Sequence, residues 1–130
     1  MMPPISFSGV TSRGPFYTPI LRGEKLHTCR KPRKRPIKIG DQLYLYWKCR
    51  VPEHLKPIHL IGRVTCTSVE RKKYSEFAYI NRFAREDGFK DCLELQEWFG
   101  DPEENGDDLY DVIWWNPGEM SVPLFRKWKK

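Results

Sequence analysis

Three kinds of feature are missing from this sequence of 130 residues. It has no apolar run near the ~18 residues that a membrane-spanning helix needs, and its first residues lack the charged and apolar regions of a secretory signal peptide. It has no Cys-x-x-Cys pair and no histidine at zinc-finger spacing from a cysteine. These absences predict a soluble, cytoplasmic protein without metal, cofactor or membrane contact. Its cysteines are expected to be free thiols, and they are Cys29, Cys49, Cys66 and Cys92.

The composition is that of a single folded domain. With 39% hydrophobic and 14% aromatic residues, the chain differs from a disordered one. At this length it can bury roughly two thirds of its unfolded surface. Prolines and glycines with small polar residues mark residues 1–14, which predicts a flexible N-terminal arm. Residues 15–130 are then expected to form one domain.

The net charge is +6, and charges of opposite sign are separated along the chain. Between Arg22 and Arg50, ten basic residues stand against two acids. Between Glu86 and Asp111, eleven acids stand against one lysine. A polyanion such as RNA would be drawn to the first region and repelled by the second. The same polarity also suits docking between protein subunits, so an adaptor function stays open.

The spacing of apolar residues predicts a mainly β fold with a few short helices. A period of two, which is typical of strands, occurs in residues 42–48, 58–67 and 109–115. Helical spacing occurs in residues 16–23, 75–86 and 91–99. Asp91, with Glu94 three positions later, has the pattern of a capping box at the start of the last helix. This order of elements indicates an α+β fold, mainly β, with short helices at the rim of a small β-barrel.

Residues 23–30, Gly-Glu-Lys-Leu-His-Thr-Cys-Arg, place a lysine, a hydroxyl and an arginine close together. In an extended segment Thr28 and Arg30 share one face, whereas Lys25 has the opposite parity unless a turn or bulge near Gly23 redirects it. The residues that follow form a basic strip with no acid before Asp41. Donor-rich cations of this kind suit a phosphate or a polarised carbonyl, although a solvated loop has the same composition. The basic strip comprises Arg30, Lys31, Arg33, Lys34, Arg35 and Lys38.

Three motifs follow one another between residues 23 and 99. They are Gly23-x-Lys25-x-x-Thr28-x-Arg30, Gly40-Asp41 before an apolar strand, and Ala84-x-x-Asp87-Gly88-Phe89 before the Asp91-capped helix. With these motifs the sequence resembles the ASCH domain, a member of the PUA-like group of small β-barrels. The resemblance implies a barrel with a cleft between the Lys-Thr-Arg segment and the Asp87 turn. It also implies RNA or a nucleotide as the ligand.

The resemblance further implies two hydrolytic activities. Some bacterial ASCH proteins look like amidohydrolases that remove the acetyl group of N4-acetylcytidine, and others have been proposed as nucleases. Carried over to this chain, Thr28 would be the nucleophile of a metal-independent hydrolase, Lys25 its base and Asp87 its acidic partner. The chain differs from the amidohydrolase pattern in having an aspartate where that enzyme has a glutamate. It also has a longer basic insertion between Arg30 and Gly40.

The same side chains also have simpler roles open to them. A lysine with an ordinary pKa of ~10.4 needs a value near ~8 to act as a base, and otherwise Lys25 holds an anion as an ammonium ion. Thr28 could be an ordinary strand residue, and Asp87-Gly88 an ordinary turn. The histidines share no metal-binding or catalytic spacing, and they are His27, His54 and His59.

Binding of RNA or a nucleotide is therefore the first hypothesis, and hydrolysis in the same cleft is the second. Both hypotheses depend on Lys25, Thr28 and Asp87. Aromatic side chains could stack on a base, a contact worth ~1–3 kcal/mol. The other predicted ligand contacts are Arg30, Arg33, Lys34, Arg35, Lys38, Trp47 and Trp114.

Overall fold

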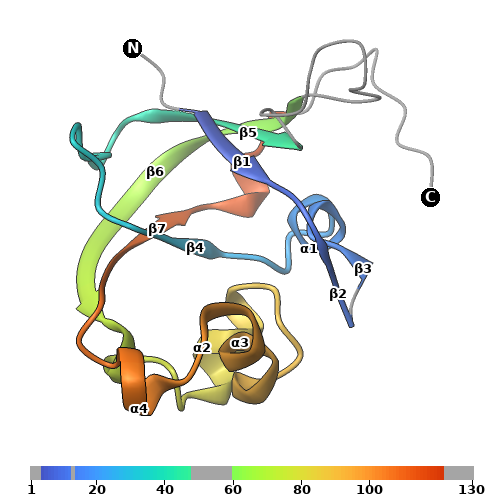
Figure 1. Cartoon of the computed structure of the whole chain (residues 1–130). Coiled ribbons are helices and arrows are strands. Elements are labelled where there is room, and N and C mark those ends of the chain that lie inside the picture. The colour runs from blue at the N-terminus through green and yellow to red at the C-terminus, as the bar shows by residue number, and fades with distance from the viewer. Residues whose placement is uncertain (1–3, 13, 48–59, 122–130) are drawn as a thin grey trace, which may run out of the picture.

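A computed structural model describes residues 4–12, 14–47 and 60–121. Five strands form one mixed sheet in the order β1-β5-β6-β7-β4 (Figure 1). In this sheet β1 and β5 are parallel, and the other neighbouring strands are antiparallel. The strands are β1 (Pro4–Phe7), β4 (His27–Arg30), β5 (Gln42–Trp47), β6 (Leu60–Lys73) and β7 (Leu109–Trp115). Two short strands, β2 (Val10–Thr11) and β3 (Gly14–Pro15), pair separately.

The sheet curls because β6 is long enough to pair with different strands along its length. Residues 60–65 of β6 pair with β5, and residues 66–73 pair with β7. The register shifts once in each pairing, at Leu45/Tyr46 opposite Gly62 and between Cys66 and Ser68. Bulges of this kind bend a strand and increase its twist. The result is a half-barrel, which confirms the predicted small α+β barrel-like fold (Figure 1).

Four short helices complete the described structure. One of them, α1, links β3 to the segment before β4, and the other three lie together at one end of the half-barrel (Figure 1). The helices are α1 (Tyr17–Leu21), α2 (Asn81–Glu86), α3 (Cys92–Phe99) and α4 (Pro102–Asn105). Single 3-10 turns at Tyr74–Glu76 and Pro117–Glu119 follow β6 and β7.

One hydrophobic core joins the sheet to the helices. Ile5 of β1 and Leu45 of β5 face each other in the parallel pair, and both are fully buried. Aromatic rings continue this core toward the helices, because Phe77 stacks on Phe83 with 4.6 Å between the ring centroids. Edge-to-face and offset ring pairs add stability beyond the area that they bury. The core therefore holds α2 and α3 against the mouth of the curled sheet.

The prediction that residues 1–14 form a flexible arm is wrong for the part of this range that the structure describes. Residues 4–7 form β1 at the edge of the sheet, where Ile5 and Phe7 are buried. Pro4 begins the strand, a position that a proline tolerates because its missing N–H is not needed there. The two glycines that suggested an arm instead allow the chain to turn, since Gly9 and Gly14 both have positive φ.

The predicted helix over residues 75–86 is also only partly correct. The α-helix begins at Asn81, and Ile80, an apolar residue within the predicted range, is 48% exposed. Half of the predicted capping box exists, since the Asp91 side chain accepts a hydrogen bond from the Glu94 N–H at 2.9 Å. The Glu94 carboxylate instead accepts from the backbone N–H of Lys90 and of Ser12. It thereby ties α3 to the β2–β3 turn.

Several predictions can be compared with only part of the chain. Cys29, Cys66 and Cys92 are free thiols, as predicted, and Cys49 lies outside the described residues. The side chain of Trp47 also lies outside the described part. Within the residues that the structure describes, no helix is both long and apolar enough to cross a membrane.

Candidate functional site

The buried polar side chains of the described residues gather mostly at one place. Five such side chains are less than a tenth exposed, and four of them meet where β4 passes the end of α2. These four are Lys25, His27, Thr28 and Asp87, and the fifth is Asp111 in β7. Burial of polar groups costs free energy unless they are paired, so their contacts decide what this site is.

Lys25 and Asp87 form an ion pair in the interior, although 62 positions separate them in the sequence. The Lys25 Nζ lies 3.3 Å from the Asp87 Oδ1, and it also donates a hydrogen bond to the backbone carbonyl of Asp87. The two side chains are 2% and 3% exposed. Burial lowers the pKa of Lys25 below its ordinary value, and the charge of Asp87 opposes that shift.

Two glycines make this approach possible. Gly23 has φ +72° and turns the chain after α1, so that the backbone N–H groups of Glu24 and Lys25 both donate to the carbonyl of Pro19. Gly88 has φ +101°, and a Cβ at that position would lie 3.5 Å from the Lys25 Cδ. Both backbone conformations are costly for any other residue, since a side chain clashes with its own backbone there.

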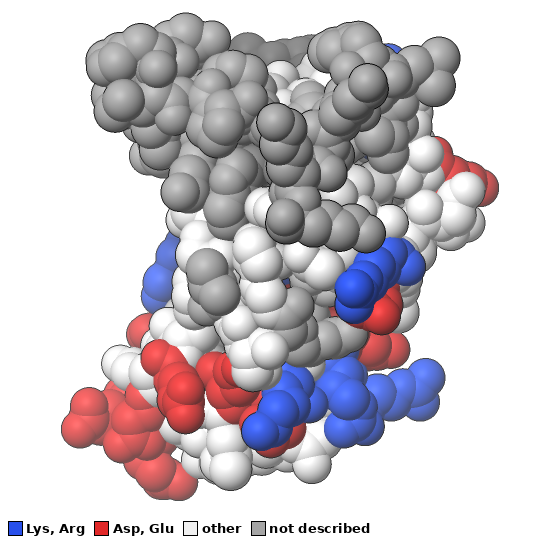
Figure 2. All heavy atoms as spheres, turned by 90° about the vertical axis from the view of Figure 1, so that its right-hand side faces the viewer, with Lys and Arg blue, Asp and Glu red and all other residues white. Residues whose placement is uncertain are grey.

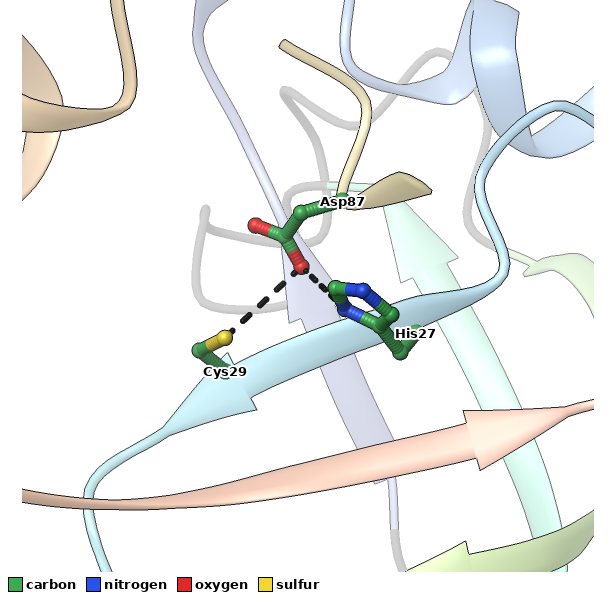
Figure 3. A group of neighbouring side chains, drawn as sticks. All are labelled: His27, Cys29 and Asp87. Carbon is green, nitrogen blue, oxygen red and sulfur yellow. Dashed lines mark hydrogen bonds and ion pairs between the residues drawn. The ribbon is translucent and has the colours of Figure 1, made fainter. Parts of the chain in front are cut away.

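Alternation along β4 and the segment before it turns three side chains toward the same carboxylate. Lys25, His27 and Cys29 share one parity, and all three contact the Asp87 Oδ1. The His27 Nδ1 lies 3.0 Å from this oxygen and the Cys29 Sγ lies 3.9 Å from it (Figure 3). Because an ionised carboxylate only accepts hydrogen bonds, Nδ1 is the protonated nitrogen of His27. The sequence analysis assigned no role to His27 or Cys29.

The His27 ring is held on both sides. It lies 4.3 Å from the ring of Phe83 and 4.3 Å from that of Trp114, centroid to centroid. Its Nε2 is buried without a hydrogen-bond partner among the described residues, and the nearest carboxylate oxygen, Oε1 of Glu86, is 4.0 Å away. This packing fixes the direction in which Nδ1 points at Asp87.

His27, Cys29 and Asp87 supply the donor atoms that a zinc site uses, within 4.8 Å of one another. Two observations favour a hydrogen-bonded cluster over a metal centre. The Lys25 ammonium group contacts the same carboxylate oxygen that a metal would need. Burial, followed by the charge of Asp87, raises the pKa of the Cys29 thiol, which opposes the thiolate that binds a metal.

A pocket of about 170 Å³ opens beside this cluster. Its polar lining includes the predicted residues Lys25, Thr28, Arg30 and Asp87, which the fold therefore brings together. Five aromatic side chains form much of the remaining wall. These are Phe7, Phe16, Phe89, Trp98 and Phe99, and the sequence analysis predicted a ligand contact for none of them.

Arg30 links β4 to β1 beside the pocket. Its Nε donates to the Thr28 Oγ1 at 3.3 Å, and its Nη2 donates to the backbone carbonyl of Ser6 at 2.7 Å. The guanidinium carbon also lies 4.7 Å from the centroid of the Phe7 ring, as in a cation–π contact. The hydroxyl of Thr28 accepts from Arg30, so its own proton is available for a ligand.

Of the other predicted contacts, the five whose side chains the structure describes do not line this pocket. Arg33 is half-buried, and Lys34, Arg35 and Lys38 are exposed on the loop between β4 and β5. Trp114 packs against His27. Trp98, by contrast, is 49% exposed and lines the pocket, so it is the aromatic side chain best placed to stack on a ligand.

A curled mixed sheet, with a Lys-Thr-Arg segment facing an aspartate turn across a pocket, is the architecture expected of an ASCH domain. No protein-family model matches the chain, and no curated protein matches it in sequence. Two solved structures do match it, and both are variants of the ASCH protein of Zymomonas mobilis.

The first of these structures has a serine replaced by alanine. It matches 86% of this chain with a TM-score of 0.53 and 14% sequence identity. The second has a tyrosine replaced by phenylalanine, with a TM-score of 0.55 and 13% identity over 93% of this chain. The matches span 66% and 76% of those chains. The fold of this protein is therefore that of the ASCH domain, and the predicted resemblance is confirmed at the level of the fold.

Proposed function

We propose that this protein binds RNA or a nucleotide by taking a single base into the pocket. The observation that carries the proposal is the joint lining of aromatic rings and convergent polar groups. Pockets for drug-sized ligands are ~300 Å³ or larger, so about 170 Å³ suits one small planar ring system. Bases of every kind stack on aromatic side chains, and Trp98 offers a half-exposed ring for this purpose.

The Asp87 carboxylate supports a base that carries an amino group. Its contacts with the described residues are made through Oδ1, and the second oxygen points away from His27 and Cys29 (Figure 3). Carboxylates accept hydrogen bonds from the amino group of a base, as they do from N4 of cytosine. Arg30 and Thr28 supply donors on the other side of the pocket for the carbonyl oxygen of such a base.

The experiment is calorimetric titration of the protein with cytidine and with uridine. We expect cytidine to bind more tightly, because uridine has a carbonyl oxygen where cytidine has its amino group. Replacing Thr28 with valine removes the hydroxyl at nearly constant shape and should weaken binding. Thr67→Val on the exposed face of β6 is the matched control. Equal affinity for the two nucleosides, or no binding of either, would refute the proposed base site.

The basic strip gives the proposal a second part. The exposed cations of residues 31–38 would contact the phosphates of a longer RNA, so its affinity should fall steeply with salt concentration. Replacing Arg33, Lys34 and Arg35 with alanine should flatten that dependence. A slope that does not change would remove the strip from the proposal while leaving the base pocket intact.

Hydrolysis in the same pocket is the second candidate, and a specific observation favours it. Burial lowers the pKa of Lys25, as a general base requires, and both Lys25 and Thr28 line the pocket. For N4-acetylcytidine, the Thr28 oxygen would attack the acetyl carbonyl and pass its proton to neutral Lys25. Lys25 would return that proton to the departing amino group of cytidine. Water would then hydrolyse the acetyl-threonine ester, releasing acetate and restoring the hydroxyl.

Chromatography of N4-acetylcytidine and of short RNAs after incubation with the protein would decide between the candidates. Product that disappears in Lys25→Ala and Thr28→Ala, and that returns in part in Thr28→Ser, would establish catalysis. The absence of product from both substrates would leave binding as the function.

A further inference from the structure

We propose that a second cavity beside the base pocket binds the phosphate adjoining the bound base. This cavity, the arginine groove, is lined by Glu24, Arg82, Arg85, Glu86, Phe89 and Lys90. The inference rests on the proposed function, since it extends the base site to a nucleotide strand. It places the phosphate contacts on α2 and the turn after it, in addition to the basic strip.

The groove and the pocket share a wall. Phe89 lines both cavities. Glu24 and Glu86 line the groove, whereas their chain neighbours Lys25 and Asp87 line the pocket. The two cavities therefore lie on either side of the same two backbone segments, 24–25 and 86–89. A nucleotide whose base enters the pocket has its sugar and phosphate within reach of this shared wall.

The groove supplies cations in a suitable arrangement. Arg82 and Arg85 are three positions apart on α2, so their side chains lie on neighbouring positions of one helix face. Lys90 follows the turn at Gly88, and all three basic residues are exposed. Figure 2 shows Lys and Arg side chains gathered toward the lower right of one face, beside a group of Asp and Glu side chains at the lower left. Guanidinium groups bind phosphate through paired N–H donors.

Two carboxylates in the groove compete with a phosphate for the basic side chains and reduce the net positive charge. Glu86 lies 3.6 Å from the Arg82 Nε and 4.0 Å from the buried His27 Nε2. The Arg82 side chain is 84% exposed, and an exposed ion pair of this kind is worth ~0–1 kcal/mol, so a phosphate can compete for the guanidinium. Three basic groups against Glu24 and Glu86 leave a net positive charge of one, which a bridging phosphate diester would balance.

The volume of the groove fits a phosphate and sugar better than a second base. At about 550 Å³ it has about three times the volume of the pocket, and Phe89 is the single aromatic side chain in its lining. A base needs a stacking surface, whereas a solvated phosphate needs donors and room for water. The pocket therefore selects the base, and the groove holds the strand beside it.

The test compares cytidine, which has no phosphate, with the dinucleotide cytidylyl-cytidine at several salt concentrations. The variant is R82Q/R85Q/K90Q, which removes the charges and keeps polar, unbranched side chains. The control is R63Q/K73Q on the exposed side of β6. We expect the variant to bind cytidine within about twofold of the wild type and the dinucleotide about tenfold more weakly. The slope of log affinity against log salt concentration should be smaller by up to ~0.7, since the dinucleotide has one phosphate and each neutralised phosphate contributes ~0.7.

Each result has one meaning. Dinucleotide affinity within about twofold of the wild type in R82Q/R85Q/K90Q, or an equal loss in the control, would overturn the inference while the base site stands. If the wild-type protein bound neither cytidine nor the dinucleotide, the proposed function itself would fail, and the inference with it. Circular dichroism of the variants verifies that they are folded.

Discussion

Replacement of Asp87 by asparagine is the sharpest test of the buried cluster. The substitution keeps the shape of the side chain and an oxygen that can accept from His27, but it removes the negative charge beside Lys25. The Lys25 ammonium group would then stay buried, with the backbone carbonyl of residue 87 as its remaining hydrogen-bond acceptor among the contacts described. The free energy of unfolding should fall, because a buried charge is left without its counter-ion.

The size of the loss has a lower and an upper bound. Removing one partner of a buried ion pair costs ~3–5 kcal/mol, and the surviving backbone acceptor places this case near ~3 kcal/mol. The cost cannot exceed that of neutralising Lys25 at pH 7. From an ordinary pKa of 10.5 this is about 3.5 units at ~1.36 kcal/mol each, or ~5 kcal/mol. A loss of ~3 kcal/mol lowers the melting temperature by roughly 10 °C in a chain of this size.

Urea unfolding followed by circular dichroism measures this loss. Asp107→Asn, at a carboxylate whose side chain is 97% exposed, is the matched control and should change stability by less than ~0.5 kcal/mol. In the double variant with Lys25→Met, much of the loss should be recovered, because the unpaired charge is gone. A loss below ~1 kcal/mol in Asp87→Asn, or no recovery in the double variant, would refute the view that the two charges depend on each other.

Three further predictions follow from the same geometry. Gly88→Ala and Gly40→Ala should each lower the free energy of unfolding by ~1–2 kcal/mol, because both glycines have positive φ. Only Gly88→Ala should weaken nucleoside binding, since Gly88 packs on Lys25. Urea unfolding and calorimetric titration of both variants test this, and equal nucleoside affinity of the two variants would contradict it. Because the lowered pKa of Lys25 means that the unfolded state binds more protons, the stability of the wild type relative to Lys25→Met should rise as pH rises toward 10.5. Urea unfolding across that range measures the difference, and a falling difference would contradict the assignment. Trp98→Ala should weaken nucleoside binding by ~1–3 kcal/mol, whereas Leu93→Ala, at another exposed position of α3, should leave the affinity measured by calorimetry unchanged.

The sequence alone determined the class of fold and several of its elements, although not the strands β1, β2 and β3. The alternation in residues 109–115 coincides with β7, and the Asp91 cap begins α3 at the expected residue. These features are local, because periodicity and capping depend on residues a few positions apart. The parity of Lys25 relative to Thr28 is local as well. It predicted opposite faces unless the chain turns near Gly23, and with Gly23 at φ +72° both side chains line the same pocket.

Only the tertiary structure decided what lies opposite those faces. His27 and Cys29 had no visible role in the sequence, because their partner, the Asp87 carboxylate, comes from another element about sixty residues away. The same holds for Trp98 and for the arginine groove, which exist as surfaces only after α2 and α3 pack at the mouth of the half-barrel. Spacing along a chain tells which side chains share a face. The packing of distant elements, driven by burial of the common core, selects which faces meet.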